Sequence, residues 1–209
     1  MLKRLAVLAA ALAVSSAAVA HADSISGFFS ATGTDSFTAP SPTGTLTFAP
    51  GTSVVAGAIG GTFASYLTVG NPITFATGPI PYVQGNNIPP SILLFSTTEA
   101  GETFGFTVST FNALFVTDGT QGCLTGNTCL TITGIGTFTG TGAVNYTPTP
   151  AEFQYSSQYV VGQAVGGLTS FSASTSATPP PIPEPATLAL FGTGLVGIVG
   201  MARRRFSTN

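Results

Sequence analysis

Positive charge is almost absent from this sequence. The five Lys and Arg residues stand near its two ends, and the stretch from Asp23 to Pro183 has no Lys, Arg, His or Trp. The charged residues of this stretch are therefore all acidic. It holds six of the seven Asp and Glu residues of the sequence, and the seventh is Glu184. Nucleic acids and anionic lipid surfaces are held by cationic side chains. The composition therefore excludes both as electrostatic partners of this stretch.

Groups that move protons or bind metals are equally scarce. Serine is abundant, but a serine nucleophile needs a neighbouring base such as His or Lys, and the stretch contains neither. Two cysteines without a histidine do not make up the four ligands of a zinc site. We therefore predict no catalytic residue, no metal ion and no cofactor.

The acidic residues leave two alternatives open. A glycosidase would need a pair of carboxylates across a cleft, for which Glu99 and Glu102 with Asp118 or Glu152 are the best candidates. The segment Glu99-Ala-Gly-Glu102 is more simply a hairpin turn with solvated carboxylates. Calcium is the second alternative, because Asp35, Asp118 and Glu152 with backbone carbonyls would suit a hard cation. No Asp-x-Asp-x-Asp-Gly ladder accompanies them.

The N-terminal segment has the layout of a secretory signal peptide. Two basic residues precede an apolar run, Leu5 to Val14, and small residues follow it. The triplets 18–20 and 20–22 both suit a signal peptidase, and the second places cleavage between Ala22 and Asp23. An uncleaved anchor is the alternative, but the run is shorter than the ~20 residues of a membrane span. Residues 1–22 are thus predicted to be a removable signal helix that uses the secretion translocon.

Four features follow one another in the C-terminal part of the sequence. They are a Pro-rich linker (176–182), the triplet Pro183, Glu184 and Pro185, an apolar stretch (186–202), and the cluster Arg203, Arg204 and Arg205. As a helix the apolar stretch would measure about 25 Å, close to the hydrocarbon thickness of a membrane. Basic residues that flank a span stay on the cytoplasmic side. The stretch is therefore predicted to be a transmembrane helix, with the preceding domain outside.

This combination of triplet, span and basic tail, over residues 182–209, resembles a PEP-CTERM sorting signal. The resemblance implies export across the inner membrane and processing by an exosortase, a polytopic membrane enzyme that acts near the triplet. It also implies release or transfer to the cell envelope or the extracellular matrix. By this likeness Pro183, Glu184 and Pro185 are the recognition site, the span is a transient anchor, and the arginines stop transfer. A plain C-terminal anchor behind a linker is the alternative.

Cys123 and Cys129 enclose a short loop with Gly126-Asn127 at its turn. Export exposes them to an oxidising compartment, where such a pair forms a disulfide. In the chain-entropy model a loop this short contributes about 2 kcal/mol.

Apolar and polar residues alternate along residues 23–175, as in Thr103 to Val108, and Pro, Gly and Asn interrupt the runs. A period of two is typical of strands, so we expect a single exported all-β domain, a sandwich or jelly-roll of short antiparallel strands. A glycine string (134–142) lacks the helix of a dinucleotide loop and indicates close backbone approach or a bulge. A turn of helix is the alternative for 153–165. Strands are expected near residues 24–31, 36–48, 54–69, 73–77, 92–97, 103–116, 128–138, 143–146, 153–160 and 168–174.

Tyrosines offer the one candidate ligand contact. Tyr155 and Tyr159, flanked by Gln154 and Gln158, suit stacking on sugar rings, although alternating tyrosines in a strand more often pack against neighbours. Together the features predict a non-enzymatic surface or extracellular-matrix protein with exopolysaccharide as an expected partner. The alternatives are a carbohydrate- or calcium-binding extracellular module and an unrecognised hydrolase.

Overall fold

The structure is a computed structural model that describes residues 23–38, 43–85, 87–88, 91–117, 123–160, 167–179 and 194. The chain divides into two compact units, residues 1–178 and 179–209. The predicted signal helix and the predicted transmembrane helix (186–202) fall outside the described residues, apart from Gly194. Within the part that is described, no helix has both the length and the apolar character needed to cross a membrane.

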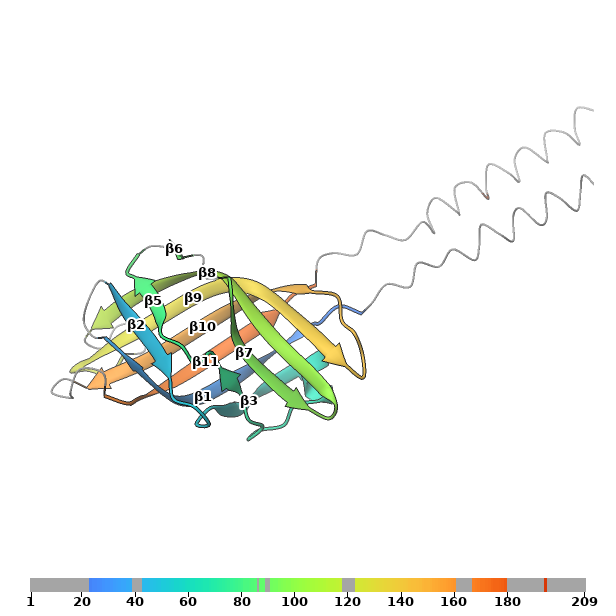
Figure 1. The fold of residues 1–209 in the computed structure, drawn as a ribbon, viewed down its shortest axis with the longest axis horizontal. Coiled ribbons are helices and arrows are strands. Elements are labelled where there is room, and N and C mark those ends of the chain that lie inside the picture. Colours follow the sequence, from blue (N-terminus) through green and yellow to red (C-terminus); the bar gives the residue numbers. More distant parts are fainter. Residues whose placement is uncertain are drawn as a thin grey trace, which may run out of the picture. The chain divides into compact units, whose positions relative to one another are not determined.

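The first unit is an antiparallel sheet of 11 strands (Figure 1), which confirms the all-β prediction. The strands are β1 (Gly27–Phe37), β2 (Thr43–Phe48), β3 (Val54–Gly61), β4 (Thr74–Phe75), β5 (Ile80–Val83), β6 (Asn87–Ile88), β7 (Ile92–Glu99), β8 (Glu102–Thr117), β9 (Asn127–Gly142), β10 (Thr149–Val160) and β11 (Thr169–Ala177). A 3-10 helix, η1 (Thr62–Ser65), follows β3. β8 and β9 each have 16 residues, so they are longer than the short strands expected.

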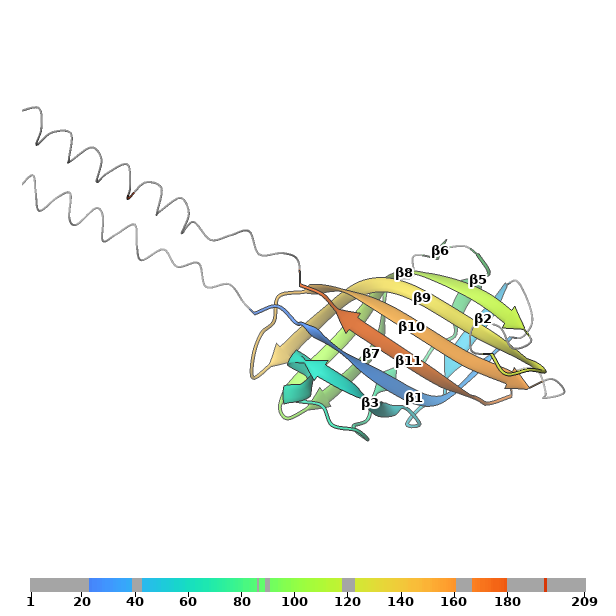
Figure 2. The same cartoon turned by 180° about the vertical axis from the view of Figure 1, so that it is seen from behind.

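The sheet is continuous and curls around the core. Its neighbours run in the order β4-β7-β8-β9-β10-β11-β1-β2-β5, while β3 also pairs with β1 and β6 with β8. Directly after β5, the last strand in this order, Gln84 forms a bridge with Ala113 in β8. The β5 edge of the sheet therefore lies beside β8, near the other edge. In Figure 1, β2, β5 and β7 lie in front of β8 to β11, and Figure 2 shows β9, β10, β11 and β1 as one layer. The two layers of the predicted sandwich are thus two parts of one curled sheet.

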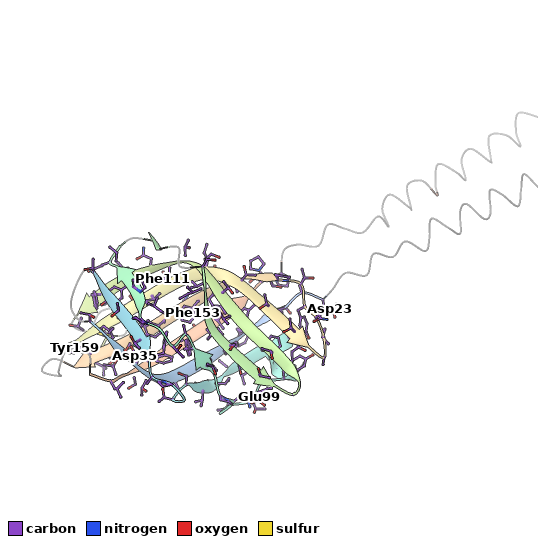
Figure 3. All side chains as sticks on the ribbon, in the orientation of Figure 1. Asp23, Asp35, Glu99, Phe111, Phe153 and Tyr159 are labelled. Atoms are coloured by element: carbon purple, nitrogen blue, oxygen red, sulfur yellow. A yellow bond between two sulfur atoms is a disulfide. The ribbon has the colours of Figure 1, made fainter. Side chains whose placement is uncertain are left out.

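Side-chain alternation fills the interior. In β11 buried and exposed residues alternate without a break, so that Phe171, Ala173 and Thr175 point inward and the serines between them outward. The interior is rich in phenylalanine, and Phe48 stacks on Phe75 with ring centroids 4.3 Å apart. Figure 3 shows the side chains on the ribbon, with Phe111 and Phe153 labelled. Both are buried, on β8 and β10.

Several local predictions differ from the structure. The break expected between residues 31 and 36 is absent, because β1 runs without interruption from Gly27 to Phe37. The helix suggested for 153–165 is wrong as far as Val160, because β10 pairs along its whole length with β9. The strand predicted at 143–146 is a bend, with the Tyr146 amide donating to the Gly140 carbonyl oxygen at 3.0 Å. The strand predicted for 54–69 stops at Gly61, where φ is 64° and the chain turns into η1. The strand at 80–83 was not predicted.

Candidate functional site

Three hollows adjoin one another on the outer face of the sheet around Glu152. Their volumes are about 500, 290 and 200 Å³, and Glu152 lines all three. The alternation of β10 explains its position, because Phe153 and Tyr155 point inward and therefore direct Glu152 and Gln154 to the outside. We call this surface the Glu152 groove. It extends over β8, β9 and β10 on one side of Glu152 and over β11, β1 and β3 on the other.

The Glu152 groove combines hydroxyl and amide groups with two exposed apolar side chains. Its polar lining comes from Ser, Thr, Asn and Gln residues of neighbouring strands. Phe28 is 50% exposed and Ile135 is 57% exposed. The Phe28 ring lies over Gly60, its partner across the β1–β3 pair, where any side chain would collide with it. The groove thus offers one aromatic ring, one carboxylate and many neutral hydrogen-bonding groups.

A buried carboxylate lies on the opposite, inner face. Asp35 of β1 is 0% exposed; it accepts hydrogen bonds from the Tyr155 hydroxyl at 2.5 Å, the Ser157 hydroxyl at 2.8 Å and the Thr169 hydroxyl at 2.9 Å. Burial raises the pKa of Asp35, although the three hydroxyl donors oppose this shift. Burial, and then the Asp35 charge, raise the pKa of Tyr155 well above its usual value. The cluster joins β1, β10 and β11 inside the core.

The two predicted ligand tyrosines have different positions. Tyr155 is only 3% exposed and its hydroxyl is bound to Asp35, so the predicted ligand contact is wrong for this residue. Tyr155 is two residues from Phe153 in β10, so both side chains point to the same, inner face of the sheet. Tyr159 is half-buried, with its ring 6.3 Å from that of Phe37 near the other end of β10. For Tyr159 the ligand contact stays a prediction.

The predicted hairpin at Glu99 and Glu102 is present, but one of its carboxylates is not solvated. The two residues face each other across the β7–β8 pair, and the turn between them has positive φ angles of 51° at Ala100 and 80° at Gly101. Glu102 is 0% exposed, because the segment that follows β9 covers it and the Val144 amide donates to its Oε2 at 3.0 Å. Its Oε1 has no hydrogen-bond partner among the described residues. The expectation of two solvated carboxylates is therefore corrected.

The remaining acidic residues do not converge. Asp35 points into the core, Glu152 points outward, and Asp118 lies outside the described residues. Over the described ranges, no group of three or more His, Cys, Asp or Glu side chains could hold a metal ion. Of the described residues named for the calcium alternative, Asp35 and Glu152 thus lie on opposite faces of the sheet.

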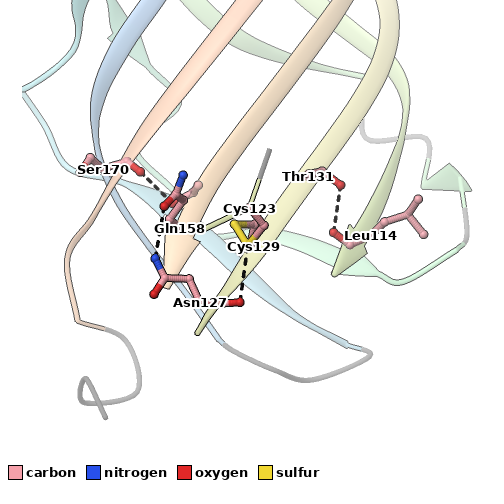
Figure 4. The surroundings of a disulfide bond; sticks show 8 residues. Leu114, Cys123, Asn127, Cys129, Thr131, Gln158 and Ser170 are labelled. Carbon is pink, nitrogen blue, oxygen red and sulfur yellow. Dashed lines mark hydrogen bonds between the residues drawn. A yellow bond between two sulfur atoms is a disulfide. The ribbon is translucent and has the colours of Figure 1, made fainter. Parts of the chain in front are cut away.

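The predicted disulfide is present. Cys123 and Cys129 are bonded, with their Cα atoms 5.7 Å apart. Figure 4 shows the bond beside the start of β9, where the Asn127 side-chain amide donates to Gln158 Oε1 of β10 at 3.3 Å. The bond therefore ties the end of the loop before β9 to the first residues of that strand, since β9 begins at Asn127.

Comparison with protein families concerns the C-terminal part of the chain. The fold and the cysteine bond are those expected of an exported all-β domain. A family model, the PEP-CTERM protein-sorting motif, matches residues 181–205, which include Pro183, Glu184, Pro185 and the three arginines. The chain thus carries a PEP-CTERM sorting motif, which implies export, processing by an exosortase at the membrane, and delivery to the cell envelope or the extracellular space. Neither the curated proteins nor the solved structures contain a match to the chain.

Proposed function

We propose that this chain is a non-enzymatic surface or extracellular-matrix protein, whose β domain is the cargo delivered by the sorting signal. The match at residues 181–205 is the observation that carries the proposal, because this motif addresses a protein to the outside of the cell. The composition supports it, since the stretch from Asp23 to Pro183 has no Lys or His to act as a base. The secretion translocon, an exosortase and exopolysaccharide are the proposed partners.

The test replaces Pro183, Glu184 and Pro185 together by alanine in the full chain. We expect the variant to stay in the membrane fraction with residues 186–202 attached, because the exosortase no longer recognises its site. Fractionation and mass spectrometry of the C-terminal peptide measure this. The matched control replaces Pro179 and Pro180, which lie before the matched motif, and should sort normally. Secreted wild-type protein with an intact terminus that includes Arg205 would refute the sorting mechanism.

A carbohydrate-binding module is the second candidate, favoured by the Glu152 groove. Aromatic rings stack on the apolar faces of sugars, and side-chain amides, hydroxyls and carboxylates hydrogen-bond to sugar hydroxyls. The groove presents Phe28, Gln154 and Glu152 for these contacts. The described part of the domain carries no Lys, Arg or His to attract an anionic polymer. We therefore propose a neutral polysaccharide as the ligand.

Electrophoresis in gels that contain a neutral polysaccharide tests this second candidate. We expect the wild-type protein to be retarded and Phe28→Ala to lose most of the retardation, because the stacking ring is gone. Leu93→Ala is the matched control, since Leu93 is 54% exposed on β7 and does not line the groove. Equal mobility of all three proteins, with and without polysaccharide, would rule out the groove as a sugar site.

A further inference from the structure

Glu102 is a buried carboxylate that is only half satisfied. Its side chain is 0% exposed, Oε2 accepts the Val144 amide, and Oε1 has no partner among the described residues. A buried carboxylate without a full set of partners costs considerable free energy, and a nearby cation offsets that cost best. The environment of Glu102 therefore suits one more positively charged donor.

The exported domain can obtain such a donor from its own N-terminus. No Lys, Arg or His occurs between Asp23 and Pro183. Hydrolysis of the Ala22–Asp23 bond adds water, leaves a carboxylate on Ala22 and creates an α-amino group on Asp23, which is protonated at neutral pH. Lys3, the sole lysine of the sequence, leaves with the signal segment. The new α-amino group is then the one primary amine of the mature chain.

The structure places Asp23 close to the segment that covers Glu102. The Thr147 amide donates to the Asp23 carbonyl oxygen at 2.9 Å, and Ser24 forms a parallel bridge with Thr147. Three residues earlier, Val144 donates to Glu102. One short segment thus contacts both the start of the mature chain and the buried carboxylate. In Figure 3 Asp23 lies at the same end of the sheet as Glu99, the residue opposite Glu102.

Tyr146 connects the two positions. Its hydroxyl is 3.0 Å from that of Tyr66. Burial raises the pKa of Tyr146 to about 12, helped by Tyr66 and by the negative charges of Glu102 and Asp23. Both acidic residues therefore lie within electrostatic reach of the same hydroxyl group.

We infer that signal cleavage before Asp23 completes this domain, because the α-ammonium group it creates forms an ion pair with the buried Glu102 carboxylate beside Tyr146. The Asp23 carboxylate, Glu99 and the hydroxyls of Tyr66 and Tyr146 are the other titratable groups facing this position. None of them carries positive charge, so none repels the ammonium, and the Asp23 carboxylate adds to the negative potential that holds it. Processing outside the cytoplasm thereby fixes the first residues of the mature chain against the β7–β8 hairpin.

The test measures how readily the α-amine of purified exported protein reacts with an acetylating reagent as the pH is varied. A free α-amine titrates at about 7.7–8.0. We expect the wild-type value to be higher by about one pH unit, because ion pairing favours the charged form. Glu102→Gln should restore the ordinary value and react about fivefold faster near pH 8. Glu99→Gln, the matched control at the facing position, should react almost like the wild type.

Thermal unfolding gives an independent readout. Complete acetylation of the wild-type α-amine should lower Tm by about 2–4 °C or more, whereas acetylated Glu102→Gln should unfold at the same temperature as before acetylation. A wild-type α-amine that titrates at 8 or below overturns the proposal without any variant. So does a mature chain that begins at another residue, or a Ca²⁺-dependent rise in Tm that survives acetylation. These measurements concern the N-terminus alone and do not depend on the fate of the sorting signal.

Discussion

Asp35 shows, at the scale of a single residue, how this core holds a carboxylate without a cation. Hydroxyl groups of Tyr155, Ser157 and Thr169 donate to its two oxygens; Thr169 is on the adjacent strand β11, and the other two are on β10, one strand further. Hydrogen bonds to a carboxylate are stronger than those between neutral groups, but they do not fully replace water. The pKa of Asp35 is accordingly raised, with burial as the main cause.

This shift predicts how stability depends on pH. The folded state binds the Asp35 proton more tightly than the unfolded chain does. In the unfolded chain the pKa of Asp35 is near 3.8. The Asp35 contribution is therefore fully present below pH 3.8 and is lost as the pH rises through the raised pKa. Asp35→Asn has a similar shape and does not titrate. Relative to the wild type, we expect its free energy of unfolding to improve from pH 3.5 to pH 7.

Urea unfolding of purified protein at the two pH values measures this difference. Glu152→Gln is the matched control, because Glu152 is exposed and its replacement should leave the wild-type pH dependence in place. A wild-type protein and an Asp35→Asn variant with parallel pH profiles would contradict the prediction.

The glycine string of β9 illustrates what a sequence pattern decides at the scale of an element. Its alternating glycines indicated a bulge or close approach, and both are present: the β8–β9 register shifts between Val108 and Thr110, directly beside Gly136. A Cβ on Gly136 would lie 2.2 Å from the Thr107 carbonyl oxygen and 2.8 Å from the Phe106 ring. The glycine is thus required by packing against β8.

Gly136→Ala is therefore expected to destabilise the domain by about 1–3 kcal/mol, because neither the backbone oxygen nor the buried ring can move away freely. Chemical denaturation of the purified exported protein measures the change. Gly78→Ala is the matched control, since nothing lies within 4 Å of the added methyl group, and it should stay within about 0.5 kcal/mol of the wild type. If the two variants were equally stable, the close approach at Gly136 would have no energetic role.

At the scale of the whole molecule, charge is separated along the chain and not across a surface. Arginine and lysine occur near the two ends, and the charged residues of the β domain between them are all acidic. Two of these, Asp35 and Glu102, are buried, so the outer surface depends on hydroxyl and amide groups for its hydration. A surface of this kind matches neutral hydroxyl-rich polymers better than ionic ones, which is why the Glu152 groove is paired with a neutral polysaccharide.

Local chemistry let several features be predicted without a fold. Period-two alternation predicted the β class, because residues two apart share one face of a strand. The cysteine spacing predicted the disulfide, because only five residues separate the partners and their Cα atoms can approach to 5.7 Å. The sorting signal is a linear motif, and the match at residues 181–205 confirms it.

The sequence does not show which face of a strand points into the core. Tyr155 was expected at the surface and is buried, whereas Glu152, named only as a candidate calcium or glycosidase carboxylate, forms the centre of the groove. Alternation says that positions 152 and 155 face opposite ways, but it does not say which side is the interior. The inward direction of Phe153 is fixed only when the sheet curls and other strands cover that side.

Sequence alone therefore determined this protein's destination, its strand content and its disulfide, since each depends on residues that are neighbours in the chain. The tertiary structure decided which carboxylates are buried and which are exposed. Asp35 meets Ser157 and Thr169 across sequence separations of 122 and 134 residues, and Glu102 meets Val144 across 42. Contacts of that range exist only once β1, β11 and β10 have paired and β8 has paired with β9, because strand pairing and not the order of residues brings these side chains together.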